Sequence, residues 1–173
     1  MEPAGSPRRP KDAVGTEAFR IGLISDTHGL LRPEALDALR GAGLILHAGD
    51  IGKPEILEAL RALAPVRAVR GNNDRDAWAK ALPETDTIEV AGVRIYLLHA
   101  LQELSLDPAA SGLNVVVAGH SHRPVVERRG PVLYVNPGSA GPRRFRLPVS
   151  VAVLEVRGGT VEARLIELVP QNA

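Results

Sequence analysis

The chain of 173 residues is predicted to form an α/β fold, in which two facing sheets carry helices on their outer sides. Two observations predict it. In the first half, apolar runs alternate with helical patterns, which is typical of a parallel sheet with crossover helices. In the second half, apolar runs follow one another across glycine turns, which indicates hairpins. The length suits one domain. We place that domain at residues 19–173 and predict a disordered tail at residues 1–18.

The first half predicts three strands and two helices. The strands are expected at residues 19–25, 44–46 and 66–69. The first helix begins at Pro33 and ends before Gly41, because proline favours the first helical turn and glycine the position after the last. The second helix covers residues 54–63, where apolar residues recur at helical spacing until Pro65 stops it.

The second half predicts mainly strands. They are expected at residues 87–90, 93–98, 115–118, 131–135, 149–156 and 160–169. Ala91-Gly92 and Gly158-Gly159 supply turns for two hairpins. A short helix is expected within residues 101–111.

The composition excludes several classes of protein. The chain has no cysteine, which removes disulfides, thiolate metal sites and cysteine hydrolases. The formal net charge is +1, so no global field favours nucleic acid or a membrane surface. No apolar stretch approaches the roughly 20 residues of a membrane span. The segment before residue 18 lacks the apolar core of a secretory signal, and we expect a cytoplasmic protein.

Polar side chains with metal-binding chemistry follow five of the apolar runs. The seven candidate ligands are Asp26, His28, Asp50, Asn72, His99, His120 and His122. Each also has a structural interpretation when it is taken alone. An aspartate there can cap the next helix, and Asn72 can be a turn residue. His99 can be a hydrogen-bonded strand end, and the His120–His122 pair can lie in a surface loop.

The joint pattern favours metal binding over these separate interpretations. All seven candidates lie at strand ends, where α/β folds build their sites. Carboxylate, amide oxygen and imidazole suit a pair of divalent ions. Two such ions roughly 3.5–4 Å apart clamp a phosphate in hydrolases of this type. The sequence therefore predicts a metal-dependent hydrolase.

The motifs resemble those of a known family. The set Asp-x-His, Gly-Asp, Gly-Asn-x-Asp, His and Gly-His-x-His occurs here in the order found in the calcineurin-like metallophosphoesterases. The local sequences resemble their small bacterial and archaeal phosphodiesterase (YfcE-like) branch. They are Ile-Ser-Asp-Thr-His-Gly at 24–29, His-Ala-Gly-Asp-Ile at 47–51, Ala-Gly-His-Ser-His-Arg-Pro at 118–124 and Asn-Pro-Gly-Ser at 136–139. The resemblance covers residues 20–168.

This resemblance implies a fold, a ligand set and a reaction. The fold would be a four-layer α-β-β-α sandwich of two facing mixed sheets with flanking helices. One ion would take Asp26, His28, Asp50 and His122. The other would take Asp50, Asn72, His99 and His120, so that Asp50 bridges the two. A bridging hydroxide would then attack phosphorus in line.

The chain departs from the family pattern at two places. Many relatives carry a histidine after the ligand asparagine, where it can protonate the leaving oxygen, and here that residue is Asn73. General acid help is worth ~10²–10⁴ in rate, so we expect weak turnover of alkyl esters and better turnover of aryl esters. Relatives often have Gly-His after the ligand histidine, whereas this chain has Ala100-Leu101. Asp50, Asn73 and Asp74 are the candidate catalytic residues, and Asp74 is also a candidate to hydrogen-bond the loop around Asn72.

Several other polar residues have two interpretations. His47 is either a residue that orients a ligand carboxylate or a buried structural histidine. Four arginines either contact substrate phosphate or are solvated surface charges, and we favour the second for each: Arg75, Arg123, Arg143 and Arg144.

The leading hypothesis is a phosphodiesterase acting on a small phosphoester, with two divalent ions as cofactors. Mn²⁺ is the expected activator, and Fe, Ni²⁺ and Zn²⁺ are alternatives. A non-catalytic scaffold of the same fold is the rival, but scaffolds tend to lose ligands and this chain keeps all seven. A phosphomonoesterase or a nuclease is the third hypothesis. The nuclease is disfavoured because the chain has no basic stripe with interleaved aromatics for strand binding. A homodimer or homotetramer is expected from exposed strand edges.

Overall fold

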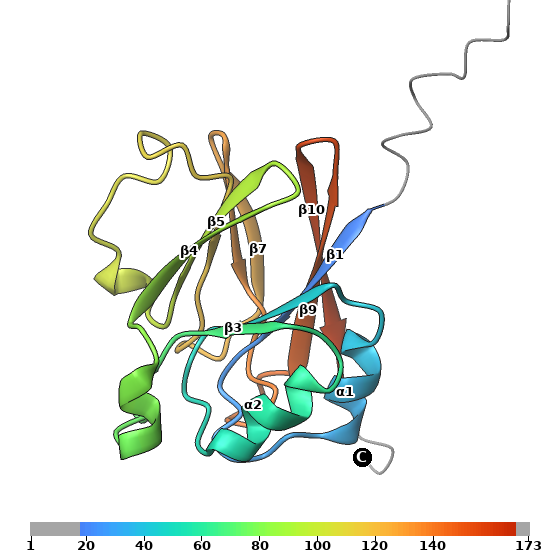
Figure 1. Cartoon of the computed structure of the whole chain (residues 1–173), viewed down its shortest axis with the longest axis vertical. Helices are drawn as coiled ribbons and strands as arrows, with labels where there is room; N and C mark the ends of the chain where they lie inside the picture. The colour runs from blue at the N-terminus through green and yellow to red at the C-terminus, as the bar shows by residue number, and fades with distance from the viewer. Residues whose placement is uncertain (1–17, 169–173) are drawn as a thin grey trace, which may run out of the picture.

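The computed structural model describes residues 18–168, and Figure 1 shows their arrangement as two facing sheets with helices beside one of them. Each sheet has five strands, in the orders β10-β9-β1-β2-β3 and β4-β5-β6-β8-β7. Both sheets mix parallel and antiparallel pairs. The predicted α/β sandwich of two mixed sheets is therefore confirmed. Most of the predicted tail, residues 1–17, lies outside the described residues, as do residues 169–173.

The first sheet combines the N-terminal strands with the last two strands of the chain. Its strands are β1 (Phe19–Ile24), β2 (Leu44–His47), β3 (Val66–Ala68), β9 (Ser150–Arg157) and β10 (Thr160–Glu167). β1 pairs in parallel with β2, and β2 in parallel with β3. On its other edge β1 pairs antiparallel with β9. β1 is thus the central strand, held by partners from both ends of the described chain.

The second sheet is built from the middle of the chain. Its strands are β4 (Thr85–Val90), β5 (Val93–Leu98), β6 (Val115–Val117), β7 (Val125–Arg129) and β8 (Val132–Asn136). β5, β6 and β8 run parallel to one another. β4 and β7 pair antiparallel at the two edges.

Two short helices cross between the parallel strands of the first sheet. They are α1 (Pro33–Leu39) and α2 (Pro54–Arg61), and each has proline in its first turn. Gly41 follows α1 with a φ of 85°, a conformation that glycine adopts without strain. In α2, Glu55 in the first turn and Arg61 in the last complement the helix dipole.

The apolar core lies in three layers. The main layer fills the space between the sheets, where Leu23 of β1 and Leu46 of β2 pack in one buried cluster with Leu97 and Val117 of the second sheet. A second layer joins both helices to the outer face of the first sheet. A third layer covers the outer face of the second sheet with residues from the segment after β5. That segment holds only the 3-10 helix η3 (Leu101–Glu103), so the outermost helical layer on this side is thin.

Two elements were not predicted. β7 was missed because all five of its residues are exposed and three are charged, so it has no apolar pattern. The 3-10 helix η2 (Ala77–Ala81) follows the Gly-Asn-Asn-Asp loop and was also missed. None of the helices in residues 18–168 has the length and apolar character needed to cross a membrane.

Candidate metal centre

The seven predicted ligands lie at the carboxyl ends of five strands and meet at one rim of the sandwich. Asp26 follows β1, Asp50 follows β2 and Asn72 follows β3. His99 comes directly after β5, and His120 follows β6. Parallel strands place their carboxyl ends at the same edge of a sheet. The facing sheets therefore deliver ligands from both sides of the main core.

Backbone hydrogen bonds hold the ligand loops against one another beyond the strands. The N–H of Asp26 donates to the carbonyl oxygen of Gly49 at 3.0 Å, and that of His28 donates to Asp50 at 2.9 Å. On the second sheet, the N–H of Gly119 donates to the carbonyl oxygen of His99 at 2.8 Å. The loops thus continue the parallel pairing of their strands, which fixes the spacing of the side chains.

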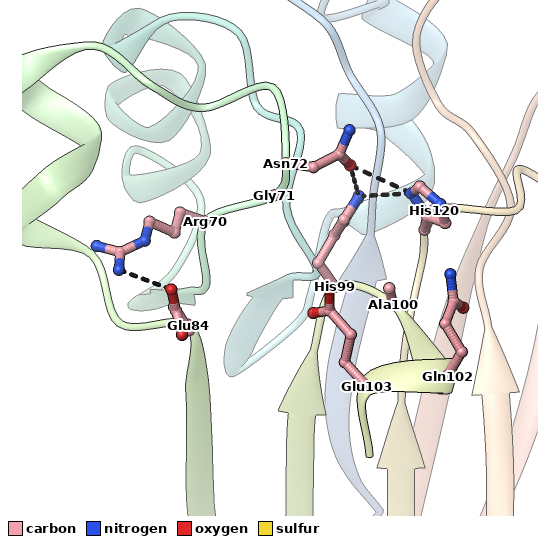
Figure 2. A pocket seen from close by; sticks show the side chains of 9 residues that line it. All are labelled: Arg70, Gly71, Asn72, Glu84, His99, Ala100, Gln102, Glu103 and His120. Carbon is pink, nitrogen blue, oxygen red and sulfur yellow. Dashed lines mark hydrogen bonds and ion pairs between the residues drawn. The ribbon is translucent and has the colours of Figure 1, made fainter. Parts of the chain in front are cut away.

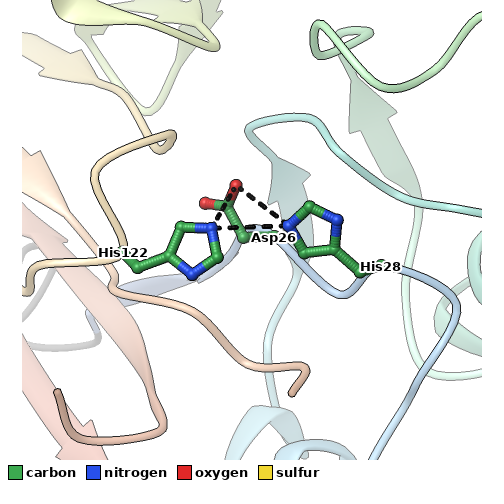
Figure 3. A group of neighbouring side chains, drawn as sticks. All are labelled: Asp26, His28 and His122. Carbon is green, nitrogen blue, oxygen red and sulfur yellow. Dashed lines mark hydrogen bonds and ion pairs between the residues drawn. The ribbon is translucent and has the colours of Figure 1, made fainter. Parts of the chain in front are cut away.

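The first group of ligands is Asp26, His28 and His122, which Figure 3 shows converging from two loops, one after β1 and one after β6. Oδ1 of Asp26 lies 3.4 Å from Nε2 of His122 and 3.8 Å from Nε2 of His28. The two Nε2 atoms are 3.4 Å apart. Donors that bind one ion at ~2.0–2.2 Å are separated by about 3 Å or slightly more, so this group has the spacing of a metal site.

The second group is Asp50, His99 and His120, and Asn72 adds a fourth donor. Oδ1 of Asn72 lies 3.0 Å from Nε2 of His99 and 3.2 Å from Nδ1 of His120, as Figure 2 shows. Those two ring nitrogens are 3.2 Å apart. The amide oxygen and both imidazoles therefore face one point.

Asp50 is placed between the two groups. Its Oδ2 lies 3.8 Å from Nε2 of His28 in the first group and 3.3 Å from Nε2 of His99 in the second. It is buried, with 3% of its surface exposed. One carboxylate is thus within reach of both groups.

Each ligand group contains lone pairs that no donor satisfies, and a cation would bind them. His99 donates from Nδ1 to the carbonyl oxygen of Ala48 at 2.8 Å, so Nε2 of the neutral ring carries only a lone pair. That lone pair faces the oxygens of Asn72 and Asp50, which are acceptors as well. In the first group, the buried Oδ1 of Asp26 has no hydrogen-bond partner among the described residues. Buried acceptors without donors are costly, and a divalent ion in each group would satisfy them.

The charges of the site shift the pKa values of its members. Burial alone would raise the pKa of Asp50, but hydrogen bonds from His99 and the N–H of Asn73 hold it well below the usual range. Burial lowers the pKa of His28, against the opposing effect of Asp50 and Asp26. For His99, burial is outweighed by contact with Asp50, and its pKa is raised. When Nε2 of His99 is protonated it donates to Asp50, and when it is not, its lone pair is free to bind a cation.

Five of the seven ligands have a backbone conformation that L-residues rarely adopt. Their φ angles lie between 46° and 71°, and they are Asp26, His28, Asp50, His120 and His122. Such residues cost stability and gather at functional sites, where surrounding contacts hold them. In the loops after β1 and β6, two such residues stand two apart, and all four belong to the ligand groups.

Glycines next to the ligands leave room for close approach. A Cβ on Gly71 would lie 2.1 Å from Oδ1 of Asp50, and one on Gly119 would lie 2.7 Å from Oδ2 of Asp26. A Cβ on Gly49 would lie 2.7 Å from Nδ1 of His99. Each of these contacts is shorter than real Cβ atoms make, so glycine is required for the ligands to pack.

Beneath the ligands, His47 holds two loops together. It is fully buried, accepts from the N–H of Gly49 at 3.1 Å and contacts Oγ1 of Thr27 at 3.0 Å. The hydroxyl of Thr27 itself donates to Ile51, so Nε2 of His47 must donate to it. Burial lowers the pKa of His47 to about 4, and a neutral ring satisfies both bonds. Of its two predicted roles, these contacts match the buried structural one.

The predicted catalytic residues other than Asp50 differ in what they touch. Asn73 donates to Asp50 and thereby lies at the site. Asp74 is buried and accepts from the N–H groups of Ile51, Gly52 and Gly71. Both of its oxygens face backbone amides, which is the loop-holding role that the sequence also allowed.

The predicted arginines are spread around the site. Arg75 donates to the carbonyl oxygen of Asn72 at 3.1 Å and thus supports that loop. Arg123, Arg143 and Arg144 are exposed. None of these three lies among the residues that line the described cleft beside the second group.

That cleft has a volume of about 350 Å³ and opens beside the second group (Figure 2). Its lining residues are Arg70, Gly71, Asn72, Glu84, His99, Ala100, Gln102, Glu103 and His120. Arg70 is paired with Glu84 at 3.0 Å. Sequence reasoning did not find Gln102 and Glu103, because nothing in the local pattern marks η3 as part of a rim. A space of this size admits a small ligand.

A family model matches most of the chain. It describes a calcineurin-like phosphoesterase superfamily domain and covers residues 19–159. This range contains all seven candidate ligands and every strand except β10.

Named relatives and solved structures agree with this match. A probable metallophosphoesterase of Methanothermobacter thermautotrophicus is 38% identical over 158 residues, which cover 84% of this chain and 91% of the relative. The phosphodiesterase YfcE of Escherichia coli K12 is 31% identical and covers 79% and 88%. Vacuolar Protein Sorting 29 of Cryptosporidium parvum has a similar fold, with a TM-score of 0.70, 20% identity and coverage of 87% and 98%.

Proposed function

Because the chain belongs to the calcineurin-like phosphoesterase superfamily, we propose that it is a phosphodiesterase with two divalent ions at its active site. The observation that carries the proposal is the position of Asp50, whose Oδ2 lies within 4 Å of a histidine in each ligand group. A carboxylate shared in this way serves two neighbouring ions. Relatives named as phosphodiesterases support the reaction class.

The proposed ligand sets follow the two groups. One ion is held by Asp26, His28, His122 and Asp50, and the other by Asn72, His99, His120 and the same Asp50. Bound divalent ions supply charge neutralisation at the phosphate and lower the pKa of a water molecule toward neutrality. The chain's own residues hold the ligands in position.

Orientation is the main contribution of those residues. Asn73 donates to both oxygens of Asp50, through its N–H at 2.9 Å and Nδ2 at 3.0 Å. Ser25 donates to Oδ2 of Asp26 at 2.7 Å, and so does the N–H of His120 at 3.1 Å. Each carboxylate therefore keeps one direction, which preserves the donor positions before substrate arrives.

The cleft beside the second group is the proposed place for one ester group. Its walls carry Gln102 and Glu103 on one side and the Arg70–Glu84 pair on the other. The mixed lining disfavours a highly charged leaving group. We therefore propose a diester with a neutral, polar or aromatic ester group there rather than a phosphomonoester.

The remaining parts of the proposal concern the metal, the cellular location and the oligomeric state. Mn²⁺ is the proposed activator, and Fe, Ni²⁺ and Zn²⁺ suit the same imidazole, amide and carboxylate ligands. A cytoplasmic location and a homodimer or homotetramer complete the proposal, together with a small phosphoester as substrate.

The proposal is tested by hydrolysis of bis-p-nitrophenyl phosphate. The purified protein should hydrolyse it with Mn²⁺, lose activity on chelation and recover on adding metal back. Metal analysis should find close to two ions per chain. p-Nitrophenyl phosphate should be a poorer substrate. Two bound ions without hydrolysis of either ester would favour the non-catalytic scaffold of the same fold.

A further inference from the structure

A basic and aromatic segment lies beside the first ligand group and has no part in the chemistry above. It consists of four consecutive residues, Arg143, Arg144, Phe145 and Arg146, and we call it the RRFR segment. All four residues are exposed. They occupy the connection between β8 and β9, the strand that pairs with β1.

The segment is anchored to the loop that carries Asp26 and His28. Oγ of Ser139 donates to the carbonyl oxygen of Asp26 at 3.0 Å, and the N–H of Ala140 donates to that of Ser25 at 3.0 Å. A Cβ on Gly141 would clash with the carbonyl oxygen of Thr27, so the backbone of this connection packs directly against the loop that follows β1. The RRFR segment begins two residues later, at the edge of the metal centre.

Phe145 has a conformation and an exposure that folding does not explain. Its side chain is 91% exposed, so it stabilises no core. Its φ is 55°, a strained value for a bulky aromatic residue. A hydrogen bond of 3.1 Å from the N–H of Leu147 to the carbonyl oxygen of Arg144 closes the turn that presents the ring. A strained turn that holds an aromatic ring in solvent indicates a binding role.

The three arginines of the segment form no ion pair with a carboxylate in residues 18–168. The opposite side of the site carries acidic side chains, because Glu84 and Glu103 line the cleft there. Free cationic charge is therefore available beside the first ligand group, next to the exposed ring.

Arginine interleaved with an exposed aromatic ring is the chemistry that recognises single-stranded nucleic acid. Bases stack on the ring, whatever their sequence, and guanidinium groups bind the phosphates. We propose that the substrate is a short single-stranded oligonucleotide, with the RRFR segment holding the nucleotide next to the scissile diester. The proposal rests on the phosphodiesterase function above. A short substrate needs only one stacking platform, so the lack of a long basic stripe does not exclude it.

The first test compares two substrates in the Mn²⁺-loaded enzyme. They are 5′-phosphorylated dithymidylate and p-nitrophenyl methyl phosphate, which has no base. Phe145→Ala should lower kcat/KM for the dinucleotide about tenfold, mainly through KM, because base stacking contributes affinity of this order. This decrease in kcat/KM should be at least fivefold larger than the decrease that Phe145→Ala causes for p-nitrophenyl methyl phosphate. Phe145→Trp should restore the dinucleotide rate, whereas Phe145→Leu should not.

The second test measures binding by fluorescence anisotropy with labelled, phosphorothioate-linked pentathymidylate. The triple variant R143Q/R144Q/R146Q should bind at least tenfold more weakly and show a shallower salt dependence, because each phosphate contact contributes about 0.7 to the slope. Arg40→Gln is the matched control. Arg40 directly follows α1, and its neighbour Gly41 lies near Arg20 at the start of β1. The control residue is therefore at the opposite end of the first sheet from the metal centre.

The outcomes separate this inference from the proposed function. Hydrolysis of p-nitrophenyl methyl phosphate with no oligonucleotide binding, or equal losses on both substrates, would overturn the oligonucleotide proposal and leave the phosphodiesterase intact. No hydrolysis of any diester would overturn the function itself. Phe145-dependent sedimentation with vesicles of equal phosphatidylserine and phosphatidylcholine, without an oligonucleotide effect, would assign the segment to a membrane surface instead.

Discussion

The side-chain amide of Asn73 donates a hydrogen bond to Oδ2 of Asp50 at 3.0 Å. This is the same oxygen that lies between the two ligand groups. An amide has no proton to give to a leaving group at neutral pH. Asn73 therefore orients the shared carboxylate and leaves the departing ester oxygen without a general acid from this position.

Asn73→His should change which esters the enzyme hydrolyses. A histidine can protonate an alkoxide leaving group, and such help is worth ~10²–10⁴ in rate when the proton donor is well placed. Loss of the amide contact with Asp50 will offset part of this gain. We expect the ratio of alkyl to aryl diester rates to rise at least about tenfold, as measured by kcat/KM on matched esters. Asn73→Ala, which loses the amide and adds no acid, should leave the ratio unchanged. An unchanged ratio in Asn73→His would contradict this account.

Asp50→Asn should impair both metal positions at once. The variant keeps the size of the side chain but loses the charge shared by the two groups. Changes to residues that merely orient ligands cost 10–100-fold, so we expect activity to fall at least about 100-fold. Metal analysis after dialysis should give one ion per chain or fewer. Asp37→Asn is the control, because Asp37 is exposed on α1, and it should retain full metal content. Two retained ions in Asp50→Asn would exclude a shared carboxylate.

Gly71→Ala should damage the site through sterics alone. The added methyl group would lie 2.1 Å from Oδ1 of Asp50, so either the loop or the carboxylate must move. We expect metal affinity and kcat to fall by at least about tenfold, as measured by metal titration and bis-p-nitrophenyl phosphate hydrolysis. Gly92→Ala is the matched control. Gly92 has a φ of 81° and nothing within 4 Å of the added group, so this variant should lose only about 1 kcal/mol of stability and keep its activity.

Stability should fall between pH 7 and pH 5 because of His47. Its pKa is about 4 in the folded protein and about 6.5 in the unfolded chain, so the unfolded state binds the proton first as the pH falls. The free energy of unfolding should therefore drop by about 2 kcal/mol over this range. His99 has the opposite sign, because its pKa is raised on folding.

The contribution of His47 is isolated by comparing wild type with His47→Gln. Urea unfolding in the presence of a chelator gives the stability of each protein at both pH values. Since His99 is common to both, the difference between their pH dependences belongs to His47. A wild-type pH dependence that persists unchanged in His47→Gln would show that other groups cause it.

Much of the site was predictable because its ligands follow apolar strands. The runs at β1, β2 and β5 are largely buried, and the first carboxylate or imidazole after each run is a natural candidate for the rim. The helices were predictable as well, from proline at their starts and glycine after α1. Local sequence carries this information because burial and backbone restrictions act over a few residues.

Other features depend on contacts that sequence pattern does not reveal. The left-handed conformations of Asp26, Asp50 and three histidines contradict local preference and are held only by tertiary packing. Asp74 was predicted to hydrogen-bond the loop around Asn72, but its bonds from the N–H groups of Ile51 and Gly52 in the loop after β2 join segments far apart in the sequence. β7 is exposed throughout and is defined only by pairing with β8. The RRFR segment lies beside the Asp26 loop only because of long-range contacts made by Ser139 and Ala140.

The pairing of β1 with β9 has a consequence for biosynthesis. The first ligands follow β1 directly, yet the partner strand of β1 at residues 150–157 leaves the ribosome more than a hundred residues later. Until then β1 lacks one neighbour, and the backbone of Asp26 lacks the hydroxyl of Ser139. The ligand loops therefore gain all their supporting contacts only after β9 has been made, and we expect metal to be loaded into the finished polypeptide.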